Sequence, residues 1–499
     1  MTRYIDTPNS ISYEDIKNKE FNLSSSQYKK LVMPNQSFLF VRDFLFRKLQ
    51  RKDLGVEVGS LSYIDKSPNK FIRTKALQPH FYLPEINDDT TPSILPSDFI
   101  QMNLRKGDLL ISKDGNIGEI AILDKDYPNF MLSGAIYKLP VKDEWKYYLL
   151  SIIKHDIFRE QLDFMVPKGA TIRHAKDRFL DCKIPLPTSN TGNVIKFISI
   201  LTEAIVNKEK LIKQRHSEIM RTIATELMQN QKPQNFIYKL PQIDEIKQVG
   251  RLDASLYKVF FKKGMFQVLN YIHGCKPLTE QHLELKPGPS LEVKLLGTRI
   301  DSSVPVKGFY RLITPKQITN CGILKNDEYI GTPAKIDNIK FGDILFGESG
   351  TGRTMVFLDQ DNITINNAHA HILRSRLNND LNRIITIRSI LQYYKETGIT
   401  DCLTVGGAGG HLSPSYFDRI MIPNFPENKQ EEIAKMYYNK KEYNTCDFSL
   451  DNFIQKDNDY NINAGIYELD KTAKQLKVIL NNSINNIVNA KEVNIHFSI

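Results

Sequence analysis

The side chains best suited to bind a polyanion lie in one loop of the first half of the chain. Five of them fall within nine residues beside Gly169, namely Lys168, Thr171, Arg173, His174 and Lys176. Cationic groups neutralise phosphates, and hydroxyl and guanidinium groups hydrogen-bond to the edges of bases. We predict that this loop contacts DNA, and the alternative is a solvated charged face.

The corresponding loop of the second half is rich in glycine. Residues 405–411 read VGGAGGH and carry little charge, but their backbone N–H groups can approach an anion closely. The cluster lacks the Gly-Lys-Ser/Thr ending of a P-loop and the acidic residue that follows a dinucleotide-binding loop. We therefore predict a DNA contact at His411 and no site for ATP or NAD.

Two glycine turns supply further candidates. The first turn, 113–116, offers Lys113 and Asn116, and its counterpart offers Ser349, Thr351 and Arg353. These polar groups are of the kinds that bind base edges and phosphates, so we predict DNA contacts there. Because Asp-Gly-Asn and Ser-Gly-Thr also favour hairpin turns, a purely structural role is the alternative.

A His-Ala-His sequence places His369 and His371 on one face of a predicted strand. Zinc can use this spacing, yet no third ligand lies nearby at a metal-like spacing. We expect two polar residues of a half-exposed strand. Contact with DNA is the functional alternative that we prefer to a metal site.

No catalytic motif is visible. The sequence has no Asn/Asp-Pro-Pro-Tyr/Phe motif of aminomethyltransferases, no H-E-x-x-H motif and no clear Asp…Glu-x-Lys nuclease cluster. Its five cysteines are scattered without a C-x-x-C pair, as expected of reduced thiols. We therefore expect a chain without catalytic residues, metal or bound cofactor.

The composition is that of an ordinary globular protein of several domains. The chain has 499 residues, 41% of them hydrophobic and 25% charged, and Lys plus Arg exceeds Asp plus Glu by 67 − 57 = 10. Both halves share this mild basic excess, which favours a phosphate-rich partner. No apolar stretch resembles a signal peptide or a membrane span, so we expect a cytoplasmic protein.

A long internal repeat organises the chain. Residues 107–115, GDLLISKDG, recur as GDILFGESG at 342–350, a shift of 235. Two further blocks recur in the same order, residues 22–29 at a shift of 229 and residues 168–185 at a shift of 238. This repeat is far longer than that of a solenoid, so each copy is predicted to be a whole domain.

Long helices are predicted between and after the two copies. Residues 192–230 contain no proline, and their isoleucines recur every seven residues at Ile198, Ile205, Ile212 and Ile219. This heptad seam, interrupted by Lys208 and Arg215, favours an interdomain stalk over a helix that packs on its own domain. An apolar stripe from Ala473 to Ala490 predicts a second helix that pairs with it antiparallel.

Each copy also carries shorter elements. Apolar runs such as 109–111, 120–123, 344–346 and 355–358 are rich in β-formers and predict strands. Residues 145–162 and 381–396 predict helices that follow these strands, and 427–443 predicts a further short helix. The chain is therefore predicted to be α+β.

The order of these motifs resembles one known family. A G-D-[IL]-L strand, a glycine turn, a second strand (IAILDKD at 120–126), a Gly-Ala loop, an Ile-Pro strand and a long helix occur in both copies. This ordered set is similar to the specificity subunit of type I restriction-modification systems, over nearly the whole chain. The resemblance implies two homologous target-recognition domains, each binding one half of a bipartite DNA sequence. It also implies spacer helices that form an antiparallel coiled coil and fix the gap.

The resemblance sets the expected domain boundaries and partners. Target-recognition domain 1 is expected at 1–188, the central spacer helix at 189–231, target-recognition domain 2 at 232–427 and the C-terminal spacer helices at 428–499. The implied partners are double-stranded DNA and methyltransferase subunits, two by our expectation, that bind S-adenosylmethionine. A restriction subunit that translocates DNA with ATP and Mg²⁺ is a further family partner, whose presence the sequence leaves open.

Some alternatives stay open at this point. Residues 443–471, rich in Asp and Asn, depart from the family pattern and leave the gap length open. The chain could also be the specificity subunit of a bifunctional, type IIB-like restriction-modification enzyme. Other classes are a stand-alone DNA-modifying enzyme with an unrecognised active site and a coiled-coil scaffold with two protein-binding heads.

Overall fold

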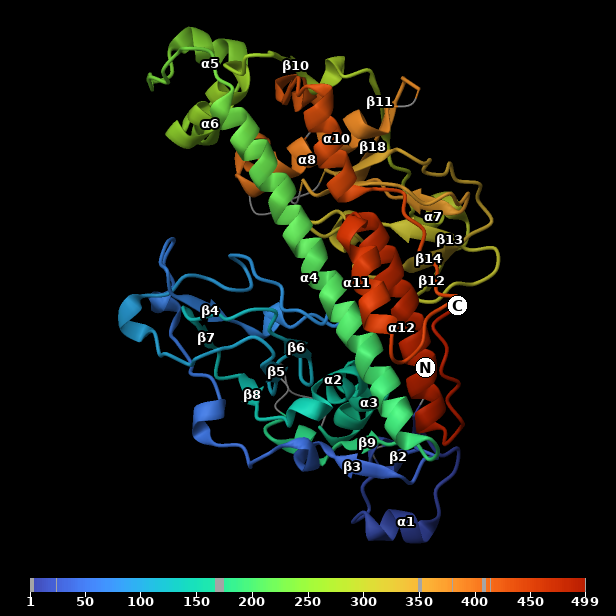
Figure 1. The fold of residues 1–499 in the computed structure, drawn as a ribbon. Helices are drawn as coiled ribbons and strands as arrows, with labels where there is room; N and C mark the ends of the chain where they lie inside the picture. Colours follow the sequence, from blue (N-terminus) through green and yellow to red (C-terminus); the bar gives the residue numbers. More distant parts are fainter. Residues whose placement is uncertain are drawn as a thin grey trace. The chain divides into compact units, whose positions relative to one another are not determined.

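The computed structural model of the protein describes residues 4–23, 25–166, 175–348, 352–378, 380–405, 410–412 and 414–498. The chain forms two compact units. Unit 1 comprises residues 1–210, 442–462 and 471–499, and unit 2 comprises residues 211–441 and 463–470. Both units combine helices and strands (Figure 1), which confirms the predicted α+β class.

One long helix, α4 (Thr191–Gln229), contributes to both units and confirms the helix predicted over 192–230. Its 39 residues contain no proline that would interrupt the hydrogen bonds, and they extend about 58 Å at about 1.5 Å per residue. Its four heptad isoleucines are at most 3% exposed. The seven-residue period therefore identified the buried face of α4 correctly.

In unit 1, α12 (Ile466–Val488) pairs with α4. Before the start of α4, Asn35 donates its side-chain amide to the carbonyls of Leu186 and Ile487, at 2.8 and 2.7 Å. Further along α4, Glu209 accepts a hydrogen bond from Lys477 Nζ at 2.8 Å. The last turn of α12 thus lies beside the start of α4, and the predicted antiparallel pairing is confirmed.

Helix α11 (Phe453–Asn463) packs beside α4 together with α12 and runs parallel to α4. Lys196 near the start of α4 pairs with Asp451 just before α11, at 2.8 Å. Lys208, three turns further along α4, pairs with Asp457 inside α11, at 2.7 Å. The Asp- and Asn-rich stretch therefore forms part of a three-helix bundle.

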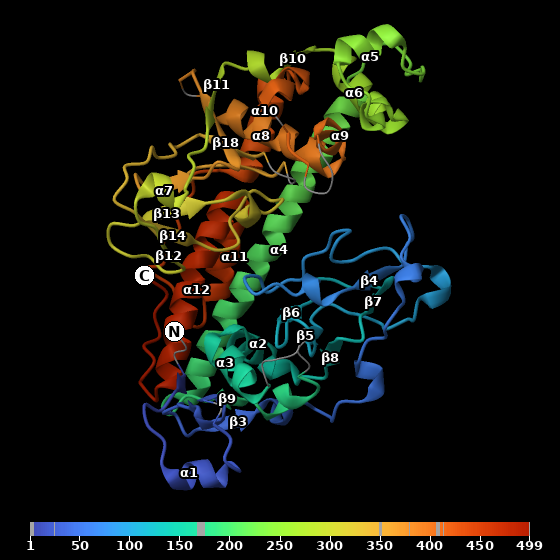
Figure 2. The same cartoon turned by 180° about the vertical axis from the view of Figure 1, so that it is seen from behind.

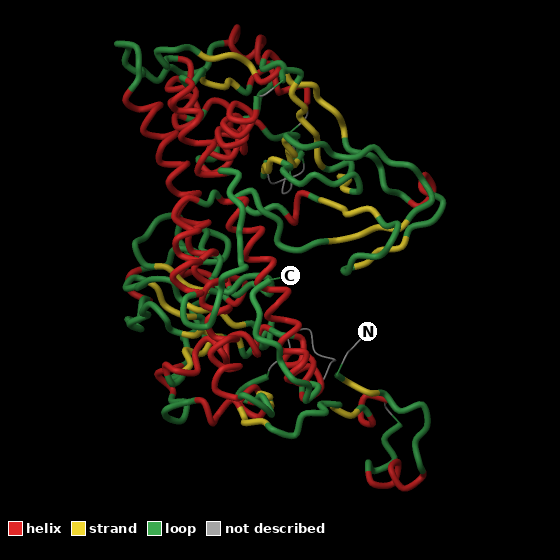
Figure 3. The backbone as a smooth tube through the Cα atoms, turned by 45° about the vertical axis from the view of Figure 1, so that its right-hand side comes forward, coloured by secondary structure: helices red, strands yellow, loops and turns green. Residues whose placement is uncertain are grey.

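The strands of unit 1 form small sheets joined by long loops (Figure 3). The central antiparallel sheet has the order β6–β5–β8, with β5 (Leu109–Ser112), β6 (Ile120–Ile122) and β8 (Ile136–Leu139). Three pairs accompany it: β4 (Lys70–Ile72) parallel to β7 (Phe130–Leu132), β3 (Phe38–Phe40) antiparallel to β9 (Lys183–Pro185), and β1 (Ile5–Asp6) antiparallel to β2 (Lys30–Leu31). Strands β5 and β6 are the predicted pair on either side of a glycine turn.

The helices of unit 1 differ from the sequence prediction in one respect. The single helix predicted over 145–162 is wrong, because two helices, α2 (Lys146–Lys154) and α3 (Asp156–Met165), occupy this segment. His155 breaks them apart: its backbone is extended, and its Nδ1 accepts a hydrogen bond from the Ile157 N–H at 3.3 Å, which caps α3. Helix α1 (Tyr13–Asn18) lies near the N-terminus, and α2 and α3 lie beside the central sheet (Figure 2).

Unit 2 contains two four-stranded sheets and one pair. The first sheet has the order β11–β18–β15–β16, with β11 (Leu283–Pro287), β18 (Ala370–Ser375), β15 (Ile344–Gly347) and β16 (Thr354–Val356). The second has the order β12–β14–β13–β17, with β12 (Ile300–Ser302), β14 (Glu328–Gly331), β13 (Tyr310–Ile313) and β17 (Thr364–Asn366). Strand β10 (Cys275–Pro277) pairs antiparallel with β19 (Met421–Pro423).

Several helices complete unit 2. They are α5 (Ile243–Val249), α6 (Val259–Leu269), α7 (Val293–Leu296), α8 (Leu381–Glu396), α9 (Ile399–Leu403) and α10 (Glu427–Tyr437). Helix α8 confirms the prediction over 381–396, whereas the helix predicted to reach 443 ends at Tyr437. The chain leaves the helix because Tyr438 is extended and the backbone N–H groups of Asn439 and Lys440 bind the Glu468 carboxylate. Across the described residues, no helix is long and apolar enough to cross a membrane.

The internal repeat is present in three dimensions. The parallel pair β4–β7 of unit 1 corresponds to the parallel pair β13–β17 of unit 2, and the hairpin β5–β6 corresponds to β15–β16. In both copies a tyrosine hydroxyl donates to the backbone carbonyl six residues earlier, Tyr28 to Asn22 and Tyr257 to Arg251. The two copies therefore share pairing and local hydrogen bonds, as the sequence blocks predicted.

Candidate nucleic-acid interface

The two loops predicted to contact DNA in the first copy meet at the end of β5. The backbone N–H of Lys113 donates to the carbonyl of Ala135, and the carbonyl of Lys113 accepts from the N–H of Ala175, both at 2.8 Å. Ala175 is the first described residue of the predicted cationic loop and precedes its last member, Lys176, so this bond anchors the end of that loop. Lys168, Thr171, Arg173 and His174 lie outside the described residues.

The described members of this group differ in exposure. Asn116 and Lys176 are exposed, and Lys176 adopts a left-handed backbone with φ +50°. Lys113 is half-buried and forms an ion pair with its neighbour Asp114. Within the described part of this region, Asn116 and Lys176 are therefore the predicted contacts most open to a ligand.

The second copy builds the same junction from different residues. At the end of β15 the N–H of Glu348 donates to the carbonyl of His369 at 3.0 Å, and its carbonyl accepts from the N–H of Leu412 at 3.1 Å. Leu412 follows the glycine-rich loop, which is closed by two reciprocal 2.9 Å hydrogen bonds between Val405 and His411. In each copy the turn after the strand and the second loop thus share one anchoring residue, although their sequences differ.

The predicted contacts of the second copy are only partly exposed. His369 and His411 are exposed, whereas Arg353 is half-buried and donates from Nη1 to the carbonyl of Ile318 at 3.2 Å. Ser349 and Thr351 lie outside the described residues. Among the described residues of these two loops, His369 and His411 are therefore the exposed predicted contacts.

His371 differs from its neighbour His369. The prediction that both imidazoles share a face of one strand is wrong, because β18 begins at Ala370 and His369 lies in the preceding turn. The His371 side chain is buried against the Phe417 ring, 3.4 Å from the Glu348 carboxylate. Burial lowers the pKa of this imidazole, an effect that Glu348 opposes. In the described ranges, no three His, Cys, Asp or Glu side chains are placed to hold a metal ion.

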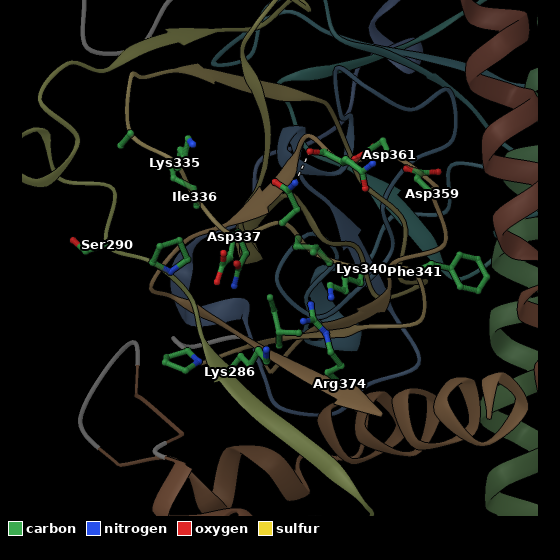
Figure 4. Close-up of a pocket in the computed structure, with 18 of the residues that line it drawn as sticks. Lys286, Ser290, Lys335, Ile336, Asp337, Lys340, Phe341, Asp359, Asp361 and Arg374 are labelled. Carbon is green, nitrogen blue, oxygen red and sulfur yellow. Dashed lines mark hydrogen bonds between the residues drawn. The ribbon is translucent and has the colours of Figure 1, made fainter. Parts of the chain in front are cut away.

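Unit 2 also has a hollow of about 1050 Å³ that the sequence did not predict (Figure 4). Its walls come from five separate segments, 286–296, 334–341, 359–362, Asn366 and 372–374. Because these segments are distant in the sequence, no local spacing pattern could have revealed the site. The polar side chains that line it include amides and lysines, the groups that bind base edges and phosphates.

The charges around this hollow divide into a paired and an exposed set. Asp359 is held by Arg311 at 2.6 Å, and Arg374 is held by Asp343 at 2.6 Å. Lys335 and Lys340, both labelled in Figure 4, are exposed and come from the loop that connects β14 to β15. Asn338 lies between them and has a buried Oδ1 atom with no hydrogen-bond partner among the described residues. The exposed lysines are thus available to a ligand, beside the exposed carboxylate of Asp337, whereas the amide group of Asn338 donates to the carbonyl of Asn362.

In unit 1, a charged network holds segment 80–83 against α4 and α12. Both oxygens of Glu209 on α4 are used: Oε2 accepts from the N–H groups of Tyr82 and Leu83, at 2.8 and 3.1 Å, and Oε1 accepts from Lys477 on α12. Lys477 also donates to the carbonyl of His80 at 3.0 Å. Segment 80–83 is therefore held by two helices at once.

A buried cation holds the chain just before this segment. Lys154 of α2 donates to the carbonyl of Gln78 at 2.6 Å and lies 3.7 Å from the Glu119 carboxylate. Burial lowers the pKa of Lys154 to about 8, against the attraction of Glu119. Sequence reasoning missed both anchors, because each joins residues far apart in the chain.

Comparison with known proteins adds independent findings. A model of the type I restriction modification DNA specificity domain matches residues 69–221. No curated protein matches the chain. The chain is also similar to three solved structures at low sequence identity. The S subunit of a type I restriction-modification system from M. genitalium is 14% identical, with 91% of this chain and 95% of that chain covered and a TM-score of 0.40.

Two further structures resemble the chain more distantly. The HsdS subunit from Thermoanaerobacter tengcongensis is 13% identical, with 91% of this chain and 97% of that chain covered and a TM-score of 0.27. A chain from a structure that concerns complex assembly and conformational transition of the type I R-M system is 12% identical, with coverages of 91% and 98% and a TM-score of 0.27. The match to the family model confirms the resemblance stated from the sequence: residues 69–221 are similar to the type I restriction modification DNA specificity domain.

Proposed function

We propose that the chain is the DNA sequence-specificity subunit of a type I restriction-modification complex and that its target is bipartite. The observation that carries this proposal is the duplicated junction, in which the residue after a central strand, Lys113 or Glu348, anchors both candidate loops of its copy. Two modules of like construction suit a target made of two separated half-sites.

The candidate loops supply both kinds of DNA contact in this proposal. Lys168, Arg173 and Lys176 contact phosphates or guanine edges in one half-site, together with Lys113, Asn116, Thr171 and His174. Arg353, His369 and His411 contribute to the other, together with Ser349 and Thr351, whereas His371 is buried against Phe417 and takes no part. The lysine-rimmed hollow of unit 2 adds phosphate contacts through Lys335 and Lys340.

The spacer helices set the gap between the half-sites. Helix α4 runs uninterrupted through residues of both units, and in unit 1 it is braced by α11 and α12. A braced helix of about 58 Å is stiff over the length of a DNA turn of ~34 Å. The gap length then follows from the helix length.

The chain acts through partners and is not itself catalytic in this proposal. Two methyltransferase subunits bring S-adenosylmethionine, and a restriction subunit that uses ATP and Mg²⁺ joins them. The specificity chain binds none of these cofactors. Its two modules offer each methyltransferase an equivalent docking face, as a pseudo-twofold arrangement requires.

The proposal is tested on the complex assembled with its co-purifying subunits. Arg173→Ala is expected to weaken binding to the target duplex about tenfold, because a base or phosphate contact is lost. Lys19→Ala, which removes an exposed lysine just after α1, is the matched control and should bind as the wild type does. Unchanged affinity of the Arg173 variant across salt concentrations would contradict the assignment of this loop.

A further inference from the structure

The seam of α4 contains a lysine that is completely buried. Leu201, Lys208 and Arg215 recur every seven residues beside the isoleucine row, and Lys208 is 0% exposed. Its aliphatic neighbours in the seam pack as in any helical bundle, so a lysine there is an exception that needs a cause. The surroundings of its ammonium group supply one.

The ammonium group of Lys208 is enclosed by residues of one segment, 443–461. Its Nζ lies 2.7 Å from Asp457 Oδ1 and donates to Asn461 Oδ1 at 2.6 Å. The rings of Tyr443 and Tyr460 lie 4.9 and 5.0 Å from it, within the range of cation–π attraction. Every direction in which the cation can donate is therefore filled from α11 and the residues before it.

The carboxylate of this pair is equally enclosed. Asp457 is a buried residue of α11, and it accepts from the Tyr443 hydroxyl at 2.7 Å and from the Asn461 side-chain amide at 2.9 Å. The two charges and their three neutral partners form a set that we name the Lys208 cluster: Lys208, Tyr443, Asp457, Tyr460 and Asn461. A polar set of this kind is satisfied in a single arrangement only.

Such a cluster adds specificity more than stability. Apolar side chains of similar volume often stabilise a core as well as a buried ion pair does, because the pair must lose its water. A single polar residue in a helical seam, in contrast, selects one axial register, because any slip leaves the polar group buried without its partner. A slip of α11 by one turn moves Asp457 about 5.4 Å away from Lys208.

We propose that the Lys208 cluster fixes the axial register of α11 on α4 and thereby restricts the complex to one gap length between its half-sites. This inference rests on the proposed function. A slip of one turn, about 5.4 Å, corresponds to between one and two base pairs at ~3.4 Å each. Lys208 is in this sense a positioning residue that touches no DNA.

The experiment replaces the cluster by apolar residues and measures gap preference. The variant Lys208→Met, Asp457→Leu, Asn461→Leu is assembled with its partner subunits and titrated with duplexes whose gap is shortened or lengthened by one and two base pairs. We expect the affinity for the native gap to stay within about threefold, because the core remains packed. The ratio of the affinity for the native gap to the affinity for altered gaps should fall about tenfold, which corresponds to the cost of one mismatched base pair.

The readout is a ratio of affinities measured on one preparation, so a loss of active protein does not change it. Lys210→Met, which removes a half-exposed lysine two residues along α4, is the matched control and should keep the wild-type ratio. If the triple variant does not fold, Asn461→Ala keeps the ion pair and should lower the ratio by a smaller amount. An unchanged ratio in whichever variant folds overturns the register lock.

The outcomes separate the two proposals. A wild-type complex that binds no bipartite target defeats the proposed function itself. A wild-type complex that selects one gap, with a variant that selects it equally well, defeats only the role of the Lys208 cluster.

Discussion

The anchor formed by Glu209 gives a prediction whose size follows from its contacts. The substitution Glu209→Ala removes a carboxylate that is 5% exposed and that accepts the backbone N–H groups of Tyr82 and Leu83. A buried N–H left without a partner costs about 1–3 kcal/mol, so two of them cost about 2–6 kcal/mol. Lys477 adds little, because it is one-quarter exposed and keeps its bond to the carbonyl of His80.

The smaller alanine side chain leaves room for water at the two N–H groups, which places the expected loss near 3 kcal/mol, at the lower part of that range. The loss is local to residues 78–83, because other bonds still hold this segment: Lys154 to the Gln78 carbonyl, Lys477 to the His80 carbonyl and the Ile122 N–H to the Tyr82 carbonyl. A local loss of about 3 kcal/mol speeds amide exchange about 100-fold.

Hydrogen–deuterium exchange of the purified chain measures this directly, at the amides of Tyr82 and Leu83. A global unfolding free energy would be a poorer measure, because a chain of two units need not unfold in one step. Glu218→Ala removes an exposed carboxylate of the same helix and should leave the exchange unchanged. Exchange at Tyr82 and Leu83 within threefold of the wild type in the Glu209 variant would refute the reasoning.

Three further predictions follow from unit 2. Gly288→Ala should sharply lower the thermal midpoint and the yield of soluble protein, because the new Cβ would lie 1.8 Å from the carbonyl oxygen of Asn367. His371→Gln should remove a pH dependence. Burial lowers the pKa of His371, so below about pH 6.5 the unfolded chain takes up a proton that the folded chain resists. Acidification therefore lowers the unfolding free energy of the wild type through this group, and the variant lacks that loss. Thermal unfolding at pH 5 and pH 7.5 measures the difference. Lys335→Ala combined with Lys340→Ala should reduce the slope of log affinity against log salt by about 2, with an unchanged slope contradicting contacts at the hollow.

Much of the fold follows from patterns that are local in the sequence. The heptad isoleucines of α4 identify a continuous helix and its buried face, and the duplicated GD-[IL]-L blocks identify the hairpins β5–β6 and β15–β16. These features depend on neighbours within a few residues, so periodicity and turn chemistry are sufficient. The antiparallel partner α12 was predicted for the same reason, although its last expected residue, Ala490, is exposed beyond the helix end.

The two errors in helix bounds have different causes, one a local cap and the other a distant contact. Residues 145–162 have the apolar pattern of one helix, yet the chain turns at His155, which caps α3. The segment after Tyr437 is rich in Lys and Glu, but Glu468, about thirty residues away, binds the N–H groups of Asn439 and Lys440 and ends α10. The contact with Glu468 is not visible from local spacing.

The candidate site likewise has a part that local sequence patterns predict and a part that depends on distant contacts. The loops that carry Lys176 and His411 were found because cations and glycines cluster in the sequence. The hollow of unit 2 was missed because it brings together segments up to about ninety residues apart. The anchor at Glu209 was missed because it joins residues more than a hundred positions apart. Lys208 was noticed as an interruption of the seam, but its partner Asp457 was not, because α11 is a separate part of the chain.

A simple assay separates the proposed function from the enzyme class. The purified chain alone, incubated with duplex DNA, S-adenosylmethionine and Mg²⁺, should leave the DNA unmodified. Methylation or cleavage by the isolated chain would establish an active site in this sequence.

The central claim is that two modules each select one half of a divided target, and selection from a random duplex pool tests it most directly. The assembled complex is used to enrich duplexes, which are then sequenced. We expect two short conserved blocks separated by an unconserved gap of one constant length. Enrichment of one continuous block, or of no sequence at all, would contradict the account.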